Sequence, residues 1–227
     1  MPAGEDRCCK SPHQWCTVVD ERRDQLQGRI VTLGVTGASG AVLAQKAIAL
    51  LEEDGRVARV LLVVTESGQR LLAEELGIAS GDLRQLPARI LGRASSKTEV
   101  LPNQDVGAVI ASGSFHVDAM IVIPCSMGAL AAVANGTSDD LLARAADVML
   151  KEGRKLVLCL RDTPFNRLHL ENMLRAQAAG AVIMPAVPAF YHQPKTVDDL
   201  VTQYVCRVLA RADLPQERMY RWAGSRT

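Results

Sequence analysis

Two glycine-containing turns in the chain have residue types that could bind an anion. The first is TGASG at residues 36–40, and the second is PCSMG at residues 124–128. Each follows an apolar segment and precedes a helical pattern, an arrangement that directs backbone N–H groups and the positive end of a helix toward a phosphate. Neither turn matches G-x-G-x-x-G or the Walker loop, so each alone is equally consistent with an ordinary helix cap. Together they favour a phosphorylated cofactor.

Arg161 is the cation with the most informative position. It ends the apolar segment KLVLCLR and is followed by DTP. A guanidinium suits bidentate recognition of phosphate, so we expect Arg161 to face an anion. Three further cations lie in or beside amphipathic segments, where each by itself is better explained as a solvated surface charge: Arg144, Lys151 and Arg207.

Cys125, in the second turn, has the chemistry of a nucleophile. A reactive thiol needs a base that lowers its pKa, but no histidine lies at an informative sequence distance from it. We therefore interpret Cys125 as a small residue that packs beside the ligand. No metal site is predicted, because the spacing of usual sites is missing from the remaining cysteine and histidine candidates: Cys8, Cys9, His13, Cys16, His116, His169 and His192.

Two motif matches point to other enzymes and are rejected. Tyr191 and Lys195 reproduce the Y-x-x-x-K of short-chain dehydrogenases, but Pro194 breaks the helix that must carry both side chains. Asp139 and Asp140 resemble part of the magnesium motif of diphosphate prenyltransferases, but no second carboxylate pair accompanies them. A helix start, with Ser138 or Asp139 as its N-cap, is the better interpretation.

Strand and helix patterns alternate along most of the chain after Gly28. Strands are expected at residues 29–35, 56–64, 119–126, 155–161 and 181–185, and helices at residues 40–53, 67–77, 127–136, 138–153, 166–180 and 196–214. Residues 78–114 are expected to form a loop-rich insert. This pattern predicts one three-layer α/β/α domain with a Rossmann or flavodoxin-like parallel sheet. Because ligands bind beyond the carboxyl ends of such strands, the polar turns should meet at one edge.

Composition narrows the class of protein. The 227 residues are 48% hydrophobic with a formal net charge of +1, which suits one enzyme-sized domain and argues against a general nucleic-acid binder. The cysteines form no disulfide framework, which favours the reducing cytoplasm. No apolar run is long enough for a membrane span. We expect residues 1–28 to be a polar, flexible extension, residues 29–214 the domain, and residues 215–227 a tail that contributes Trp222.

The ordered blocks of the sequence resemble the UbiX-type flavin prenyltransferases, also described as phenylacrylic or hydroxyaryloate decarboxylase flavoproteins. The likeness covers about residues 29–222. It is carried by the blocks GVTGASGA, ASGSF, PCSMGALAAVANG, LLARAADVMLKE, LVLCLRDTPFNRLHLENMLRAQAAGAVIMPA and PAFYHQPKTVDDLV.

The resemblance implies two adjoining ligand sites. The residues implied for FMN are Gly37, Ala38, Ser39, Thr65, Cys125, Ser126, Met127, Gly128 and Arg161. Those implied for the phosphate of dimethylallyl monophosphate are Lys151, Arg161, Tyr191 and Arg207, with Arg144 reaching the site from a neighbouring subunit. Glu75 matches a family carboxylate, and Trp222 matches a tail tryptophan near the prenyl group. Asp162 stands where the family commonly has a glutamate assigned to proton transfer.

The implied activity is transfer of a dimethylallyl group to N5 and C6 of reduced FMN, with release of phosphate and without a metal. The resemblance also implies a large homo-oligomer, commonly a dodecamer, and a UbiD-type decarboxylase that uses the prenylated flavin. Two alternatives stay open at this point: an FMN-binding flavoprotein that decarboxylates cysteine, and a non-catalytic FMN carrier. The sequence does not distinguish a monophosphate from a diphosphate donor.

Overall fold

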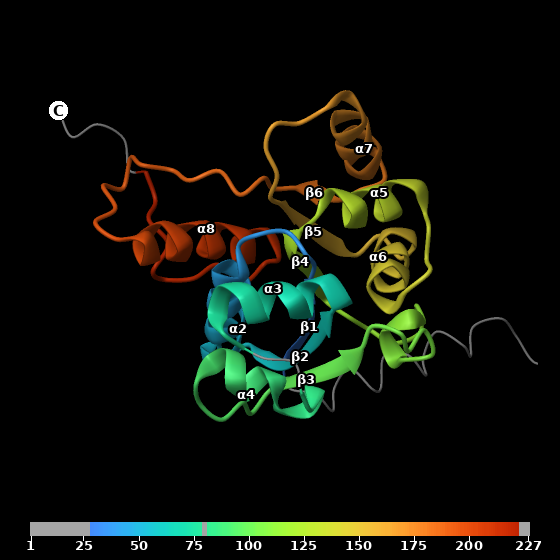
Figure 1. Ribbon diagram of the computed structural model, residues 1–227, viewed down its shortest axis with the longest axis horizontal. Coiled ribbons are helices and arrows are strands. Elements are labelled where there is room, and N and C mark those ends of the chain that lie inside the picture. The colour runs from blue at the N-terminus through green and yellow to red at the C-terminus, as the bar shows by residue number, and fades with distance from the viewer. Residues whose placement is uncertain (1–27, 79–80, 223–227) are drawn as a thin grey trace, which may run out of the picture.

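In the residues that the structure describes, 28–78 and 81–222, six parallel strands form one sheet in the order β3-β2-β1-β4-β5-β6 (Figure 1). The structure is a computed structural model. Its strands are β1 (Arg29–Val35), β2 (Val57–Val64), β3 (Thr98–Pro102), β4 (Ala119–Cys125), β5 (Lys155–Leu160) and β6 (Val182–Ile183). The chain passes outward from β1 to β3 and then returns to the other side of β1. The strand order therefore reverses between β1 and β4, which is the predicted doubly wound α/β architecture.

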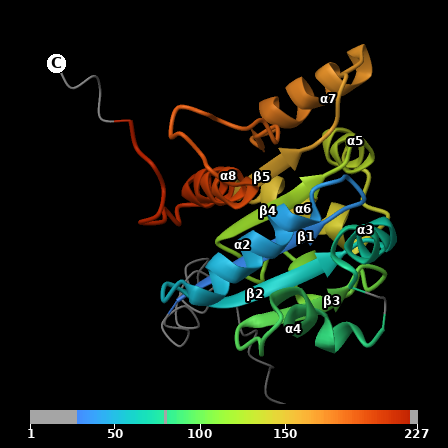
Figure 2. The same ribbon diagram turned by 60° about the vertical axis from the view of Figure 1, so that its left-hand side comes forward.

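Helices cover both faces of the sheet. They are α2 (Ala41–Glu53), α3 (Glu66–Leu76), α4 (Leu86–Leu91), α5 (Met127–Asn135), α6 (Leu141–Lys151), α7 (Arg167–Ala178) and α8 (Val197–Arg211), with short 3-10 turns η1 (Leu83–Gln85) and η2 (Val109–Ala111). Figure 2 shows α7 extending away from the sheet beyond α5. None of the helices in the described ranges is long and apolar enough to span a membrane.

The strands bury alternate residues in two separate cores. In β1, Val31 and Leu33 pack with the side of the sheet covered by α2 and α8. In β4, Met120 and Val122 belong to the opposite core, with Leu142 of α6. Burial on both faces explains why these strands have nearly continuous apolar sequences and could be predicted from them.

The prediction that residues 78–114 are largely loop was incomplete. They contain α4 and the edge strand β3, which pairs with β2 alone. The strand TEVLP has no fully buried residue, so it lacks the apolar run by which the other strands were recognised. The six-residue α4 is too short to show helical periodicity.

Two helix starts show how local side chains set the boundaries. Asp140, and not Ser138 or Asp139, caps α6, because its carboxylate accepts a hydrogen bond from the Ala143 amide at 2.8 Å. A capping box opens α8: Thr196 and Asp199 each accept a hydrogen bond from the other's backbone amide.

Glu52, near the end of α2, ties the connection before β3 to the core. The residue is 7% exposed, and its carboxylate accepts hydrogen bonds from the Ser95 and Thr98 hydroxyls at 2.6 Å and from the Ser96 and Lys97 amides at 3.1 Å. Burial raises the pKa of Glu52, but these hydrogen bonds outweigh burial and lower the pKa from 4.5 to about 2. The ionised form therefore stabilises the fold.

We predict that Glu52→Gln lowers the free energy of unfolding by about 2 kcal/mol at pH 7, because buried donors lose a charged acceptor. The stabilisation is fully present above pH 4.5 and is lost as the pH falls toward about 2, so the difference from wild type should narrow over that range. Urea unfolding at a series of pH values measures it. The control Glu53→Gln removes an exposed neighbour and should change stability by less than about 1 kcal/mol. Equal effects of the two changes would contradict the prediction.

Candidate active site

Thr36 joins the ends of β1 and β4, where the strand order reverses. Its side chain is 1% exposed, and its hydroxyl donates a hydrogen bond to the Pro124 carbonyl at 2.9 Å and accepts one from the Ser126 amide at 2.8 Å. The two glycine-containing turns are therefore held side by side. In sheets of this order the crevice outside this point is where ligands bind.

The first turn packs tightly against the start of α3. A Cβ at Gly37 would lie 2.5 Å from Ser67 Cβ, so any larger residue would push the turn away from α3. Thr65, after β2, caps α3 by accepting a hydrogen bond from the Gly68 amide at 3.0 Å, and its own amide donates to the Val35 carbonyl. The predicted FMN residues on β1 and β2 are thus neighbours.

Glu75 of α3 occupies the N-terminal end of α2. Its carboxylate accepts hydrogen bonds from the Gly40 and Ala41 amides at 3.0 and 2.7 Å. Burial raises the pKa of Glu75, but the hydrogen bonds from the Ser39 side chain and the two amides, with the charge of Arg161, keep the net pKa below its usual value. The Gly40 and Ala41 amides, which the sequence suggested as donors to a phosphate, therefore already donate to the Glu75 carboxylate.

Arg161, directly after β5, crosses to the first turn. Its Nε donates to the Ser39 carbonyl at 2.9 Å, and its amide donates to the Cys125 carbonyl at 3.2 Å. Arg161 therefore links the ends of β1, β4 and β5, through its guanidinium to the first turn and through its backbone amide to the end of β4. Asp162 beside it is exposed, and its carboxylate accepts a hydrogen bond from the Thr163 amide at 2.8 Å.

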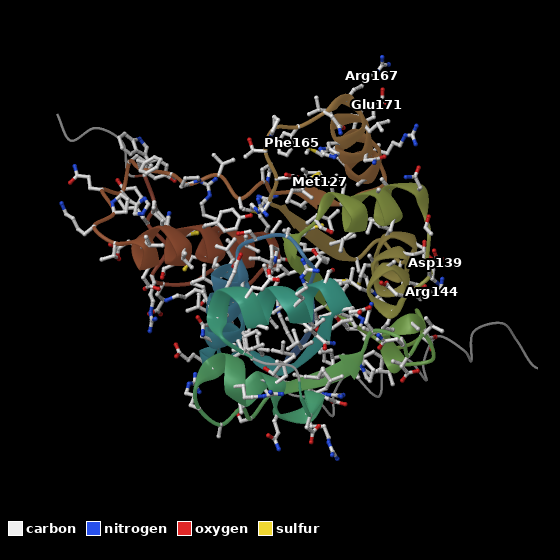
Figure 3. All side chains as sticks on the ribbon, viewed as in Figure 1. Met127, Asp139, Arg144, Phe165, Arg167 and Glu171 are labelled. Carbon is white, nitrogen blue, oxygen red and sulfur yellow. The ribbon has the colours of Figure 1, made fainter. Side chains whose placement is uncertain are left out.

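The second turn leaves an open surface. Ser126 caps α5 by accepting a hydrogen bond from the Ala129 amide at 3.2 Å. A Cβ at Gly128 would have only Ser126 Oγ nearby, at 3.9 Å, so a flat group can approach the backbone there. Figure 3 labels Met127 at the start of α5. Cys125, in contrast, is fully buried, and burial raises the pKa of its thiol, so its side chain is a core residue below this surface.

An aromatic group beside Arg207 forms a second cluster. Arg207 Nη1 donates to the Tyr191 hydroxyl at 2.9 Å, and the Tyr191 ring meets Trp222 edge-on at 6.4 Å. Tyr220 lies 5.5 Å from Tyr191, and His192 lies 6.0 Å from it, between ring centroids. Sequence reasoning missed Tyr220 and His192, although aromatic residues are so scarce in this chain that their closeness in sequence to Trp222 and Tyr191 was an available signal.

Arg207 also borders a cavity of about 350 Å³. The cavity is lined by the end of β6, the segment that follows β6, and α8, and its mostly apolar residues include Met184, Pro185, Val187 and Tyr204. The Tyr204 hydroxyl donates to the Met184 carbonyl at 2.7 Å, which holds this segment against α8. An apolar space with a cation at its edge suits a small apolar group attached to a phosphate.

Lys151 and Arg144 do not join these clusters. Lys151 precedes β5 and Arg161 follows it, so they lie at opposite ends of a strand that spans about 20 Å. Lys151 Nζ pairs with Glu152 at 3.1 Å. Arg144, labelled on α6 in Figure 3, donates to the Ala111 carbonyl and pairs with Asp147 at 2.8 Å. The two cations are seven residues apart and share one face of α6.

No cluster of three or more metal-ligating side chains occurs within residues 28–78 and 81–222. The N-terminal cysteines and histidine, and the predicted extension up to residue 27, lie outside the described residues. Three cysteines in the described part are free and buried: Cys125, Cys159 and Cys206.

Comparison with known proteins identifies the family. A model of the flavoprotein family matches residues 19–208. The flavin prenyltransferase UbiX of Halalkalibacterium halodurans is 42% identical over 197 residues, covering 87% of this chain and 95% of that protein.

Two solved structures share both the fold and substantial sequence identity. AnUbiX (PadA1), in complex with FMN and dimethylallyl pyrophosphate, superposes with a TM-score of 0.77 at 39% identity, covering 87% of this chain and 99% of that one. The dodecameric FMN-dependent UbiX-like decarboxylase of Escherichia coli O157:H7 has a TM-score of 0.76 at 40% identity, covering 86% and 100%. This chain therefore belongs to the flavoprotein family and, within it, to the UbiX-type flavin prenyltransferases.

Proposed function

We propose that this protein transfers a dimethylallyl group from dimethylallyl monophosphate to N5 and C6 of reduced FMN and releases inorganic phosphate. The bond between C1 of the allyl group and the phosphate oxygen would break, its electron pair would leave with the phosphate, and C1 would bond to N5, which would lose its proton. The allyl double bond would then take up a proton at C2 while C3 bonds to C6, which would lose its proton in turn. The observation that carries this proposal is the position of Arg161, which joins the two turns at the point where the strand order reverses.

FMN fits the surface formed by the two turns. The backbone at Gly128 is open to a flat ring, Arg161 supplies positive charge, and the hydroxyls of Ser39, Thr65 and Ser126 border the same edge. The proposed FMN residues are Gly37, Ala38, Ser39, Thr65, Ser126, Met127, Gly128 and Arg161. Cys125 is left out of this set, because its side chain is fully buried.

The donor phosphate requires fixed positive charge, because negative charge develops on it as the allyl bond breaks. Arg161 and Arg207 supply cations from one subunit, and Tyr191 supplies a hydroxyl that Arg207 already orients. Tyr191 and Trp222 present π faces that stabilise positive charge on the allyl group, worth about 0.5–2 kcal/mol. Glu75 orients the first turn through its hydrogen bonds to the amides of α2.

Lys151 and Arg144 complete the phosphate site from a neighbouring subunit. Within its own chain Lys151 lies at the far end of β5 from Arg161, so it cannot share a phosphate with Arg161 there. The proposed assembly is a homododecamer, supported by the E. coli relative at 40% identity. Each active site is then composite.

Asp162 is proposed to move the proton that leaves the flavin ring. Its carboxylate is exposed at the edge of the site next to Arg161. An aspartate is one methylene shorter than the glutamate common in the family, so we expect a slower transfer or one through a water molecule.

We further propose that a UbiD-type decarboxylase uses the product, and that the protein works in the cytoplasm, where its three buried free cysteines stay reduced. A cysteine-decarboxylating flavoprotein would not need the Arg207–Tyr191 pair, and a carrier of FMN would need neither that pair nor Lys151. The high identity to a UbiX flavin prenyltransferase also favours prenyl transfer.

Prenyl transfer can be tested directly on the purified protein. Wild-type protein given reduced FMN and dimethylallyl monophosphate without oxygen should yield prenylated flavin by mass spectrometry, and Lys151→Ala should slow formation by about a hundredfold through loss of charge stabilisation. The control Lys46→Ala removes a lysine of α2 that pairs with Asp198 at 2.6 Å, and should leave the rate unchanged. Recovery of only unmodified FMN from wild type, with either the monophosphate or the diphosphate, would refute the proposal.

The composite site can be tested with mixed oligomers. Lys151→Ala and Arg207→Ala chains, each nearly inactive alone, are co-expressed with different affinity tags and purified as mixed oligomers. If the two residues act from different subunits, random mixing should restore about a quarter of the wild-type sites. If both residues act from one subunit, the mixed oligomers would be as inactive as the parents, and our assignment of Lys151 to the neighbour would fail.

The role of Asp162 in proton transfer can be tested by substitution. Asp162→Asn should slow single-turnover prenylation by about a hundredfold, the usual contribution of a positioned acid or base. Asp162→Glu restores the longer side chain and should match or exceed the wild-type rate. A rate for Asp162→Asn equal to wild type would remove Asp162 from proton transfer.

A further inference from the structure

Lys151 is surrounded by a small network at the C-terminal end of α6. We propose that Glu152, Arg154 and the turn at residues 112–115 are positioning residues that hold the Lys151 ammonium in place for the donor phosphate of a neighbouring subunit. The inference rests on the proposed function, in which Lys151 binds that phosphate.

Glu152 lies between two cations. Its carboxylate pairs with Lys151 Nζ at 3.1 Å through one oxygen and faces Arg154 Nη2 at 3.9 Å through the other. The hydrogen bond from Lys151 and the charges of Lys151 and Arg154 lower the pKa of Glu152. The carboxylate is therefore an ionised bridge from Arg154 to Lys151.

Arg154 is the fixed end of the bridge. Its side chain is 17% exposed, and its guanidinium donates to the Gly113 carbonyl at 2.7 Å and to the Phe115 carbonyl at 2.9 Å. Two backbone acceptors hold the planar group in one orientation, which a long side chain at a surface would otherwise lack. Glu152 is thus directed by a rigid neighbour.

Gly113 brings the turn into contact with the bridge. A Cβ at this position would overlap the Glu152 carboxylate and lie 3.1 Å from Lys151 Nζ. Only glycine leaves room for both side chains as they stand. The turn therefore limits the directions in which Lys151 and Glu152 can point.

The Lys151 side chain remains accessible despite these contacts, with 46% of its surface exposed. Arg144, on the same face of α6, donates to the Ala111 carbonyl, and Arg154, just after α6, donates to the Gly113 carbonyl. These two arginines attach residues 111–115 to α6 and to the segment that follows it. The result is a surface that presents two oriented cations outward, where a phosphate held by another subunit can meet them.

An ordinary surface ion pair would have different properties. It would contribute little, and it would not depend on the size of residue 113. Gly113→Ala and Glu152→Ala therefore separate the two explanations. Gly55→Ala is the matched control, because no atom lies within 4 Å of the added Cβ.

The test measures kcat/KM for dimethylallyl monophosphate, the Kd for FMN, and the thermal midpoint in the assembled full-length protein. Gly113→Ala and Glu152→Ala should each lower kcat/KM for the donor by about fivefold, because the Lys151 ammonium is then no longer held toward the donor phosphate. The Kd for FMN should stay at the wild-type value, because none of the proposed FMN residues belongs to this network. Gly55→Ala should match wild type in all three measurements.

The double variant Gly113→Ala/Glu152→Ala keeps the inference testable if Gly113→Ala also loosens the turn. Because the added methyl group acts by displacing Glu152, the double variant should be no worse than Glu152→Ala alone. Additive losses, or a donor kcat/KM in Glu152→Ala equal to or above wild type, would overturn the inference. Failure of the proposed function is a separate outcome, in which wild type itself yields no prenylated flavin.

Discussion

The hydrogen bonds of Thr36 are the constraint on which the site depends. A buried hydroxyl that donates to the Pro124 carbonyl and accepts from the Ser126 amide fixes the ends of β1 and β4 relative to each other. Arg161 then attaches the end of β5 to the same two turns. Every proposed FMN residue follows one of these strands or β2, so a shift at Thr36 would move the whole surface.

The distribution of positive charge follows from the cost of placing like charges together. In the single chain each proposed phosphate-binding cation has its own partner: Arg161 has the Ser39 carbonyl, Arg207 the Tyr191 hydroxyl, Arg144 Asp147, and Lys151 Glu152. Two of them stand on α6, away from the other two. In the proposed assembly the four cations meet only where a phosphate compensates their mutual repulsion. Folding of one chain thus never has to bring four unpaired cations into one cavity.

The active-site edge was more predictable than its contacts. Arg161 could be recognised because it ends an apolar strand, and all ends of parallel strands on one side share an edge. The carboxylate of Glu75 at the start of α2 could not be foreseen, since nothing in its helix indicates that it turns toward Gly40. The grouping of Tyr220 and His192 with Tyr191 also depends on how the tail returns across α8, where Gln203 accepts a hydrogen bond from the Tyr220 amide.

The sequence by itself determined the alternation of strands and helices, the doubly wound sheet, and the family, because each of these depends on local periodicity or on ordered motifs. It left out β3 and α4, whose short or exposed segments owe their structure to pairing with β2 and to the anchor at Glu52. Only the tertiary structure decided which side chains of the site contact one another: Glu75 at the Gly40 and Ala41 amides, and Tyr191 beside Arg207 and Trp222. These contacts join residues that lie on different elements, and local periodicity carries no information about them until packing has set how the elements lie against one another.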